Sequence, residues 1–183
     1  GVSVFAGERT LESALSCCDK NGVSIGEELK KIGFDGPEPC GGYPIAAYFE
    51  AHIEQGPILE NEGKSVGIVK GAQGQRCFKV KVIGDEGHAG TLPMGQRKDA
   101  FQAAARMSIA IDEIAQKFQP QPVITIGAVD VIPNSRNTIP GQTIFSIDSR
   151  CPDDAALKEV ELLMREACQS IAEVRDVKLL FEA

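Results

Sequence analysis

The sequence lacks the features of a membrane or secreted protein. No run of 18 apolar residues occurs among its 183 residues, so we expect no segment that spans a bilayer. The N-terminus has no basic region followed by a long apolar stretch, so we expect no signal peptide. It also has no initiator methionine. We therefore expect this chain to be an internal piece or a processed product of a longer protein.

The chain also has fewer basic residues than acidic residues. The chain carries 19 Lys and Arg against 26 Asp and Glu, a net charge of -7, and its pI is about 4.9. An acidic chain does not attract phosphate backbones or anionic headgroups. We expect neither nucleic acid nor a membrane surface as a partner.

Cysteine motifs are missing as well. Six cysteines are present, but none forms a CxxC pair or a zinc-knuckle spacing. Such a low content argues against a disulfide scaffold. We expect reduced, mostly buried thiols in a cytoplasmic protein. The alternative is a thiol-based redox role for the adjacent Cys17 and Cys18, which requires lowered thiol pKa values.

The first third of the chain is rich in loops. Ser24 and Glu27 fit an S-x-x-E capping box, which predicts a short helix that Gly33 can end. Apolar and polar residues alternate over 46–54, which predicts a strand. Residues 57–62 predict one or two helical turns, ended by the glycine that follows.

After residue 63 we expect elements in the order β-β-α-β-β-α-β. Two long amphipathic helices, beginning near residues 97 and 153, are separated by strands. This order predicts an α+β domain of ferredoxin-like type, with a mainly antiparallel sheet and both helices on one face. The expected strands are 66–70, 76–84, 123–131, 143–150 and 177–181, and the first helix is expected over 97–118.

The chain has only two histidines, and each allows two interpretations. His52 ends the strand predicted over 46–54, where a histidine is either structural or functional. His88 lies in a glycine-flanked loop that leaves its ring accessible. A metal site needs three or four ligands, and no HExxH motif or cysteine cluster completes one here.

A second candidate site lies near the loop over 133–141. Amide donors from Asn134 and Asn137, together with the guanidinium of Arg150, can hold a carboxylate. The alternative is that the asparagines fill turn positions and that Asp148 forms an ion pair with Arg150. The sequence has no GxSxG nucleophile elbow and no GxGxxG loop.

Three ordered segments of the chain carry a resemblance to known proteins. They are Ala51–Pro57 with Leu59–Glu60, then Gly71–Arg76 with Gly87–Met94 and Arg97–Ala100, and finally Pro133–Gly141 running to Asp148–Arg150. Together they resemble the M20-type amidohydrolases that act on N-carbamoyl groups, a family that includes N-carbamoyl-L-amino acid hydrolases, β-ureidopropionases and allantoate amidohydrolases. The resemblance covers nearly the whole chain, although residues 1–45 match only loosely.

The resemblance implies two domains and a metal centre. Residues 1–65 correspond to part of an α/β metallopeptidase-like catalytic domain, and 66–183 correspond to a lid domain that also makes a homodimer interface. The intact family protein holds two divalent metal ions, zinc or manganese. Family members carry their other ligands and a general-base glutamate outside the region that this chain matches, so we expect the segment alone to be inactive.

The resemblance also implies a role for each matching residue. His52 corresponds to a metal ligand, and Gln55 corresponds to a side chain that contacts substrate near the metals. His88 corresponds to a lid histidine that reaches the substrate of the neighbouring subunit and stabilises negative charge on the carbonyl oxygen. Asn137 and Arg150 correspond to the pair that holds the substrate carboxylate.

The implied activity is metal-dependent hydrolysis of the amide C–N bond of N-carbamoyl amino acids or related ureido acids, such as allantoate and β-ureidopropionate. Two alternatives remain open. One is a catalytically inactive dimerisation or small-molecule-binding module. The other is an M20 hydrolase of the aminoacylase or dipeptidase type.

Overall fold

The computed structural model describes residues 1–119 and 121–183, and the chain forms two compact units. The first unit is Gly1–Val66 and the second is Gly67–Ala183. The first unit contains short helices joined by irregular segments, and the second contains a sheet and two long helices.

The helices of the first unit are all short. The predicted capping box is confirmed, because Ser24 Oγ accepts the Glu27 amide at 3.2 Å and Glu27 Oε2 accepts the Ser24 amide at 2.9 Å. Gly33 follows the helix in the left-handed region at φ 71°, as expected of a residue that ends a helix. The helices are α1 (Val2–Phe5), α2 (Leu11–Leu15), α3 (Ile25–Lys31) and α4 (Ile58–Asn61).

The strands predicted over 46–54 and 66–70 are wrong. Both segments lack regular secondary structure, and their apolar side chains are exposed, as with Phe49 at 92% and Ile68 at 88%. A strand satisfies its backbone hydrogen bonds only against a neighbouring strand. Within the described parts of the chain, no strand pairs with either segment.

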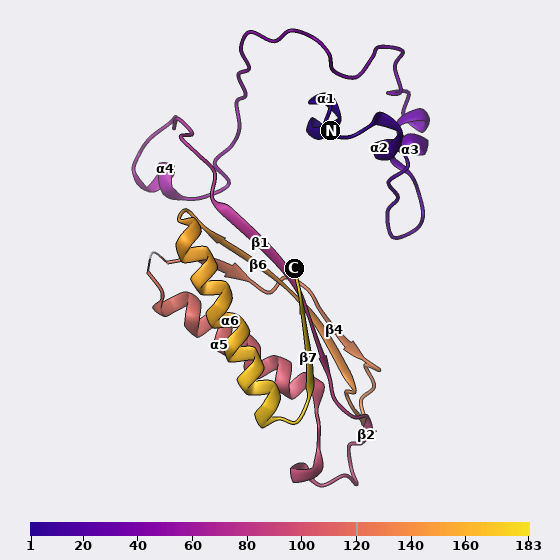
Figure 1. The fold of residues 1–183 in the computed structure, drawn as a ribbon, viewed down its shortest axis with the longest axis vertical. Helices are drawn as coiled ribbons and strands as arrows, with labels where there is room; N and C mark the ends of the chain where they lie inside the picture. Colours follow the sequence, from indigo (N-terminus) through magenta and orange to yellow (C-terminus); the bar gives the residue numbers. More distant parts are fainter. Residues whose placement is uncertain (120) are drawn as a thin grey trace. The chain divides into compact units, whose positions relative to one another are not determined.

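The second unit confirms the predicted architecture. Its main sheet has the order β3-β6-β1-β7, with β4 also beside β6, and every pairing is antiparallel (Figure 1). This is the order of the ferredoxin-like β-α-β-β-α-β arrangement. The strands are β1 (Gly74–Ile83), β3 (Val123–Thr125), β4 (Val129–Ile132), β6 (Gln142–Cys151) and β7 (Lys178–Glu182).

The single strand predicted over 123–131 is interrupted. Its first part, β3, pairs with the C-terminal half of β6, and its last part, β4, pairs with the N-terminal half. Between them, the Ala128 amide donates to Ser146 Oγ at 3.1 Å and the Ser146 amide donates to the Ala128 carbonyl at 3.1 Å. This side-chain contact replaces a regular ladder bond, which breaks the strand in two.

Two long helices cover one face of the sheet, α5 (Ala100–Lys117) and α6 (Asp154–Val174) (Figure 1). α5 begins later than the predicted residue 97, because Asp99 Oδ1 caps it by accepting the Gln102 amide at 2.9 Å. Asp153 caps α6 in the same way, by accepting the Ala156 amide at 2.7 Å.

Alternate residues of the two central strands form the core against these helices. The even-numbered residues from Phe78 to Val82 of β1 and the odd-numbered residues of β6 are buried, because successive side chains in a strand point to opposite faces. Phe101, in the first turn of α5, is 41% exposed. The core includes Phe78, Val80, Val82, Met107, Ile111, Phe145, Ile147, Val160 and Met164.

The expectation of mostly buried cysteines is wrong. Only Cys151 and Cys168 are buried, on the helix-facing side of β6 and on α6, while the remaining four are exposed. Burial raises the pKa of the Cys168 thiol to about 12, because an apolar environment disfavours the thiolate.

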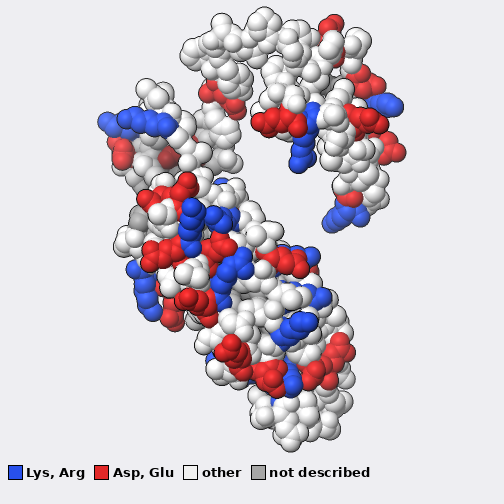
Figure 2. All heavy atoms as spheres, viewed as in Figure 1, with Lys and Arg blue, Asp and Glu red and all other residues white. Residues whose placement is uncertain are grey.

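Charged side chains of both signs lie on the surface of the second unit. Acidic and basic groups are interspersed on the face that Figure 2 shows. Over residues 1–119 and 121–183, no helix combines the length and apolar character that crossing a membrane requires.

Candidate functional site

A two-stranded antiparallel sheet brings two of the predicted site residues together. Strand β2 (Gly87–His88) pairs antiparallel with β5 (Thr138–Ile139), with His88 opposite Thr138. The next amide, that of Ala89, donates to the Asn137 carbonyl at 2.9 Å. His88 and Asn137 are therefore neighbours at this strand pair, although about 50 residues separate them in the sequence.

The ring of His88 is oriented by its own loop. Its Nδ1 accepts the Gly90 amide at 3.0 Å, so the proton of the neutral ring lies on Nε2. A Cβ at position 90 would lie 3.1 Å from His88 Cε1, so glycine leaves the space that the ring occupies. The exposed imidazole thus presents an Nε2–H donor, which is the group required to stabilise an oxyanion.

The amide of Asn137 is oriented in a similar way. The Ser135 hydroxyl donates to Asn137 Oδ1 at 3.0 Å, which leaves the Nδ2 group as a donor for a ligand. Asn134 has φ 57°, a left-handed conformation that asparagine tolerates in turns. Asn134 therefore fits the turn interpretation, whereas Asn137 remains a candidate ligand-binding residue.

Arg97 supports the His88 loop, a role that sequence reasoning missed. Its half-buried guanidinium donates from Nη2 to the Ala89 carbonyl at 2.8 Å and from Nε to the Leu92 carbonyl at 2.9 Å. These bonds fix the loop on both sides of its tip. The sequence could have pointed to Arg97, because it follows His88 closely within a matching segment. Its hydrogen-bond acceptors could not be predicted, because they are backbone carbonyls, which every residue has.

The other predicted ligand-binding residue, Arg150, lies on the sheet face opposite the helices. Its Nε donates to Asp148 Oδ1 at 3.0 Å and its Nη2 donates to Asp148 Oδ2 at 2.8 Å. Gln75 Nε2 also donates to Asp148 Oδ2, at 2.9 Å. The hydrogen bond from Arg150 lowers the pKa of Asp148, and Asp148 in turn raises the pKa of Arg150.

The ion pair considered as an alternative at Arg150 is therefore present. Sequence reasoning missed Gln75, which reaches Asp148 from the neighbouring strand β1. The sequence could have pointed to Gln75, because it lies in a matching segment at the start of a predicted strand. Because Arg150 is half exposed, the ion pair leaves it accessible to a ligand.

Within a single chain, Asn137 and Arg150 lie far apart. Asn137 lies just before β5, near the N-terminal end of β6, whereas Arg150 lies near the C-terminal end of β6. Arg150 lies eight positions after Gln142 along β6, a distance of roughly 26 Å. The second unit thus has two polar clusters at opposite ends of its sheet. The His88 strand pair contains His88 and Asn137, and the Arg150 cluster contains Arg150, Asp148 and Gln75.

The first unit holds His52 and Gln55, both exposed. His52 Nδ1 lies next to the Ile53 carbonyl, and because a carbonyl only accepts, Nδ1 carries the proton and Nε2 keeps its lone pair. Nε2 is therefore available to bind a metal ion. Gln55 adopts φ 55°, a left-handed conformation that is uncommon for a residue other than glycine.

The residues in the described ranges do not complete a metal centre. They contain no group of three or more His, Cys, Asp and Glu side chains placed to hold a metal ion. A structural or catalytic metal needs at least three protein ligands. His52 is therefore a single candidate ligand without companions among residues 1–119 and 121–183.

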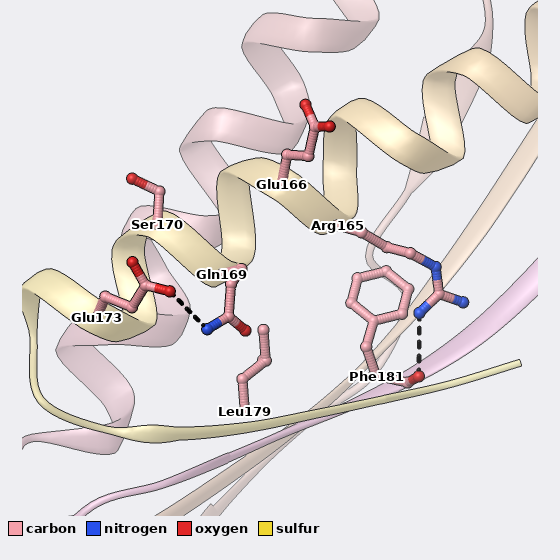
Figure 3. Close-up of a pocket in the computed structure, with 7 residues that line it drawn as sticks. All are labelled: Arg165, Glu166, Gln169, Ser170, Glu173, Leu179 and Phe181. Carbon is pink, nitrogen blue, oxygen red and sulfur yellow. Dashed lines mark hydrogen bonds between the residues drawn. The ribbon is translucent and has the colours of Figure 1, made fainter.

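A groove of about 470 Å³ lies between α6 and β7, away from the predicted site residues (Figure 3). Arg165 spans it: its guanidinium lies 4.3 Å from the centroid of the Phe181 ring and donates to the Phe181 carbonyl at 3.1 Å. The groove is therefore partly filled by a side chain that attaches the helix to the edge strand.

The fold and these clusters define an α+β domain that presents polar side chains at both ends of its sheet. Residues 70–176 match the M20 peptidase dimerisation domain, so the chain belongs to this family. The resemblance seen in the sequence motifs is thereby confirmed.

Named relatives agree with this assignment. The chain is 41% identical to an N-carbamoyl-L-amino-acid amidohydrolase of Rhizobium meliloti, over 98% of this chain and 43% of that protein. It is 36% identical to an allantoate amidohydrolase of Escherichia coli K12, over 87% of this chain and 39% of that protein. The chain therefore spans less than half the length of these relatives.

A solved structure gives the same assignment. The crystal structure of a hydantoinase/carbamoylase family amidase from Burkholderia vietnamiensis superposes with a TM-score of 0.84 at 44% identity. The match covers 98% of this chain and 44% of that chain. The similarity therefore includes both units.

Proposed function

We propose that this chain is part of an amidohydrolase that cleaves the amide C–N bond of N-carbamoyl amino acids or related ureido acids, among them allantoate and β-ureidopropionate. The names of its relatives support this class of reaction. The observation that carries the proposal is the His88 ring, whose Nδ1 accepts the Gly90 amide and whose Nε2–H is left to donate to a carbonyl oxygen.

The polar side chains have distinct roles in this reaction. His88 Nε2–H stabilises the negative charge that develops on the carbonyl oxygen when the tetrahedral intermediate forms. Arg150 binds the substrate carboxylate, assisted by the Asn137 amide. Gln55 contacts the substrate from the first unit. Each group binds or orients the substrate, and none is the nucleophile.

The separation of the two clusters supports a homodimer with shared active sites. Roughly 26 Å of strand separates Arg150 from Gln142, which lies at the end of β6 next to the His88 strand pair, and a small ureido acid is far shorter than this. One substrate therefore cannot touch both groups of the same chain. We infer that each active site takes His88 and Asn137 from one subunit and Arg150 from the other, with the second unit as lid and dimerisation domain.

The metal requirement also belongs to this proposal. His52 would supply one ligand through Nε2 to a site of two divalent ions, zinc or manganese. The described residues of this chain do not provide the other ligands, so we assign them no step that depends on the metal. In the same proposal, residues 1–65 belong to the catalytic domain. The protein acts in the cytoplasm and has no nucleic-acid or membrane partner.

The test is turnover by the full-length protein. His88→Asn removes the Nε2–H donor while keeping a polar side chain of similar size. We expect kcat for an N-carbamoyl-L-amino acid to fall about 100-fold, the usual loss for one oxyanion donor, with a smaller change in KM. Steady-state kinetics measures both values.

Two outcomes would contradict the proposal. Unchanged kcat in the His88→Asn variant would remove His88 from the reaction. A full-length wild-type protein that forms dimers without any turnover would support the alternative of a dimerisation or binding module, because dimer formation would then be the activity that remains.

A further inference from the structure

The contacts of Arg150 engage only one edge of its guanidinium. Asp148 accepts from Nε at 3.0 Å and from Nη2 at 2.8 Å, a side-on pair of hydrogen bonds. Guanidinium has five N–H donors, so the two on Nη1 and the second on Nη2 remain. One N–H of Nη1 and the second N–H of Nη2 form the end-on edge, which no acceptor from the described residues occupies.

Asp148 is itself held in place by the sheet. It lies opposite Cys77 on β1, while Arg150 lies opposite Gln75. Gln75 donates from Nε2 to Asp148 Oδ2 at 2.9 Å, so the two Asp148 oxygens accept three hydrogen bonds. All these residues stand on β1 and β6, the two central strands of the sheet (Figure 1), and strands position side chains more accurately than loops do.

A restrained arginine has an advantage for binding. A free arginine side chain loses many rotamers when it is immobilised by a ligand, which weakens binding. The side chains of Arg150 and Asp148 are 52% and 35% exposed, so solvent and ligands reach the pair. The ion pair therefore restricts the arginine without blocking its end-on edge.

We propose that Asp148 is a positioning residue, which holds the Arg150 guanidinium side-on so that its Nη1 and Nη2 edge binds the substrate carboxylate end-on, while Gln75 fixes Asp148. The proposal rests on the proposed function of Arg150 as the carboxylate-binding residue. It makes Asp148 a determinant of affinity for the carboxylate and assigns it no contact with the substrate.

The experiment compares variants of the full-length, metal-loaded protein. Asp148→Asn keeps the shape of the side chain but loses its charge and one acceptor oxygen. We expect KM for an N-carbamoyl-L-amino acid to rise about tenfold, the effect of losing one charge-assisted hydrogen bond, with kcat and the melting temperature unchanged. Asp130→Asn is the matched control, because Asp130 is exposed on the neighbouring strand β4, and we expect it to have no effect.

A neutral analogue separates positioning from general damage to the fold. With the carboxamide of the same substrate, we expect Asp148→Asn to leave KM unchanged. An equal rise in KM for the carboxamide would overturn the proposal, because the effect would then not depend on the substrate charge. A lowered melting temperature together with reduced kcat would also overturn it, since this indicates a structural role.

Arg150→Ala distinguishes failure of this inference from failure of the proposed function. If Arg150→Ala leaves KM unchanged, the carboxylate-binding role fails and the inference fails with it. If Arg150→Ala raises KM but Asp148→Asn does not, only the inference about Asp148 is overturned. We expect the double variant to have the KM of Arg150→Ala alone, because Asp148 acts through Arg150.

Discussion

At the scale of single residues, glycine at position 90 decides how the His88 ring lies. The Gly90 amide bonds to Nδ1 at 3.0 Å, and the missing Cβ leaves room for the ring. The sequence drew attention to His88 because glycines flank it. The ring contact itself could not be predicted, because it depends on backbone torsions that many glycine-containing loops can adopt.

Gly90→Ala tests this arrangement. The added Cβ would meet His88 Cε1 at 3.1 Å and Nδ1 at 3.4 Å, so we expect the ring to shift. A misplacement of this size costs about tenfold or more in rate. We therefore expect kcat of the full-length protein to fall about tenfold with little change in stability, measured by steady-state kinetics and thermal melting.

Gly95→Ala is the control for this variant, because an added Cβ at Gly95 meets no atom within 4 Å. We expect it to retain wild-type kcat. Equal activity of the two variants would show that the position of the ring does not depend on Gly90.

At the scale of helices and strands, an ionic network joins α6 to the sheet. Glu161 on α6 accepts from Arg76 of β1 at 2.7 Å and from Arg165 one turn later at 2.9 Å. Its side chain is only 17% exposed. The Arg165 guanidinium also lies over Phe181 of β7, so the network connects three elements.

Glu161→Ala tests how much this network contributes to the free energy of unfolding. It leaves the charges of Arg76 and Arg165 without their shared acceptor, and removing one partner of a partly buried pair is costly. We expect the free energy of unfolding to fall by about 2 kcal/mol, measured by urea unfolding followed by circular dichroism. Glu159→Ala, at an exposed position of the same helix, should change it by less than about 0.5 kcal/mol; an equal loss in both variants would show that the network adds nothing.

Local patterns predicted the elements of the second unit better than those of the first. Alternation over β1 and β6 is correct because both strands pack one face on helices and leave the other face open. The same alternation over 46–54 predicted a strand that is absent, because pairing depends on a neighbour and not on the segment itself. The ionic network at Glu161 could not be predicted from local patterns either, because Glu161 and Arg76 are 85 positions apart in the sequence.

At the scale of the whole molecule, the two polar clusters lie at opposite ends of the sheet. Sequence proximity placed Asn137 and Arg150 in one site, but the extended strand β6 lies between them. The residues themselves could be named from matching segments. Their separation could not, because it follows from the course of a strand whose length and pairing are set by the whole sheet.

The central claim is that each active site combines His88 of one subunit with Arg150 of the other. The measurement is kcat/KM of hybrid dimers of the full-length protein, made by co-expressing His88→Asn and Arg150→Ala subunits with different tags and purifying through both. One site of each hybrid has both residues intact and the other has neither, so we predict about half of the wild-type kcat/KM, against a large loss in each parent homodimer. Hybrids no more active than the parents would contradict the claim, because His88 and Arg150 would then have to act from the same chain.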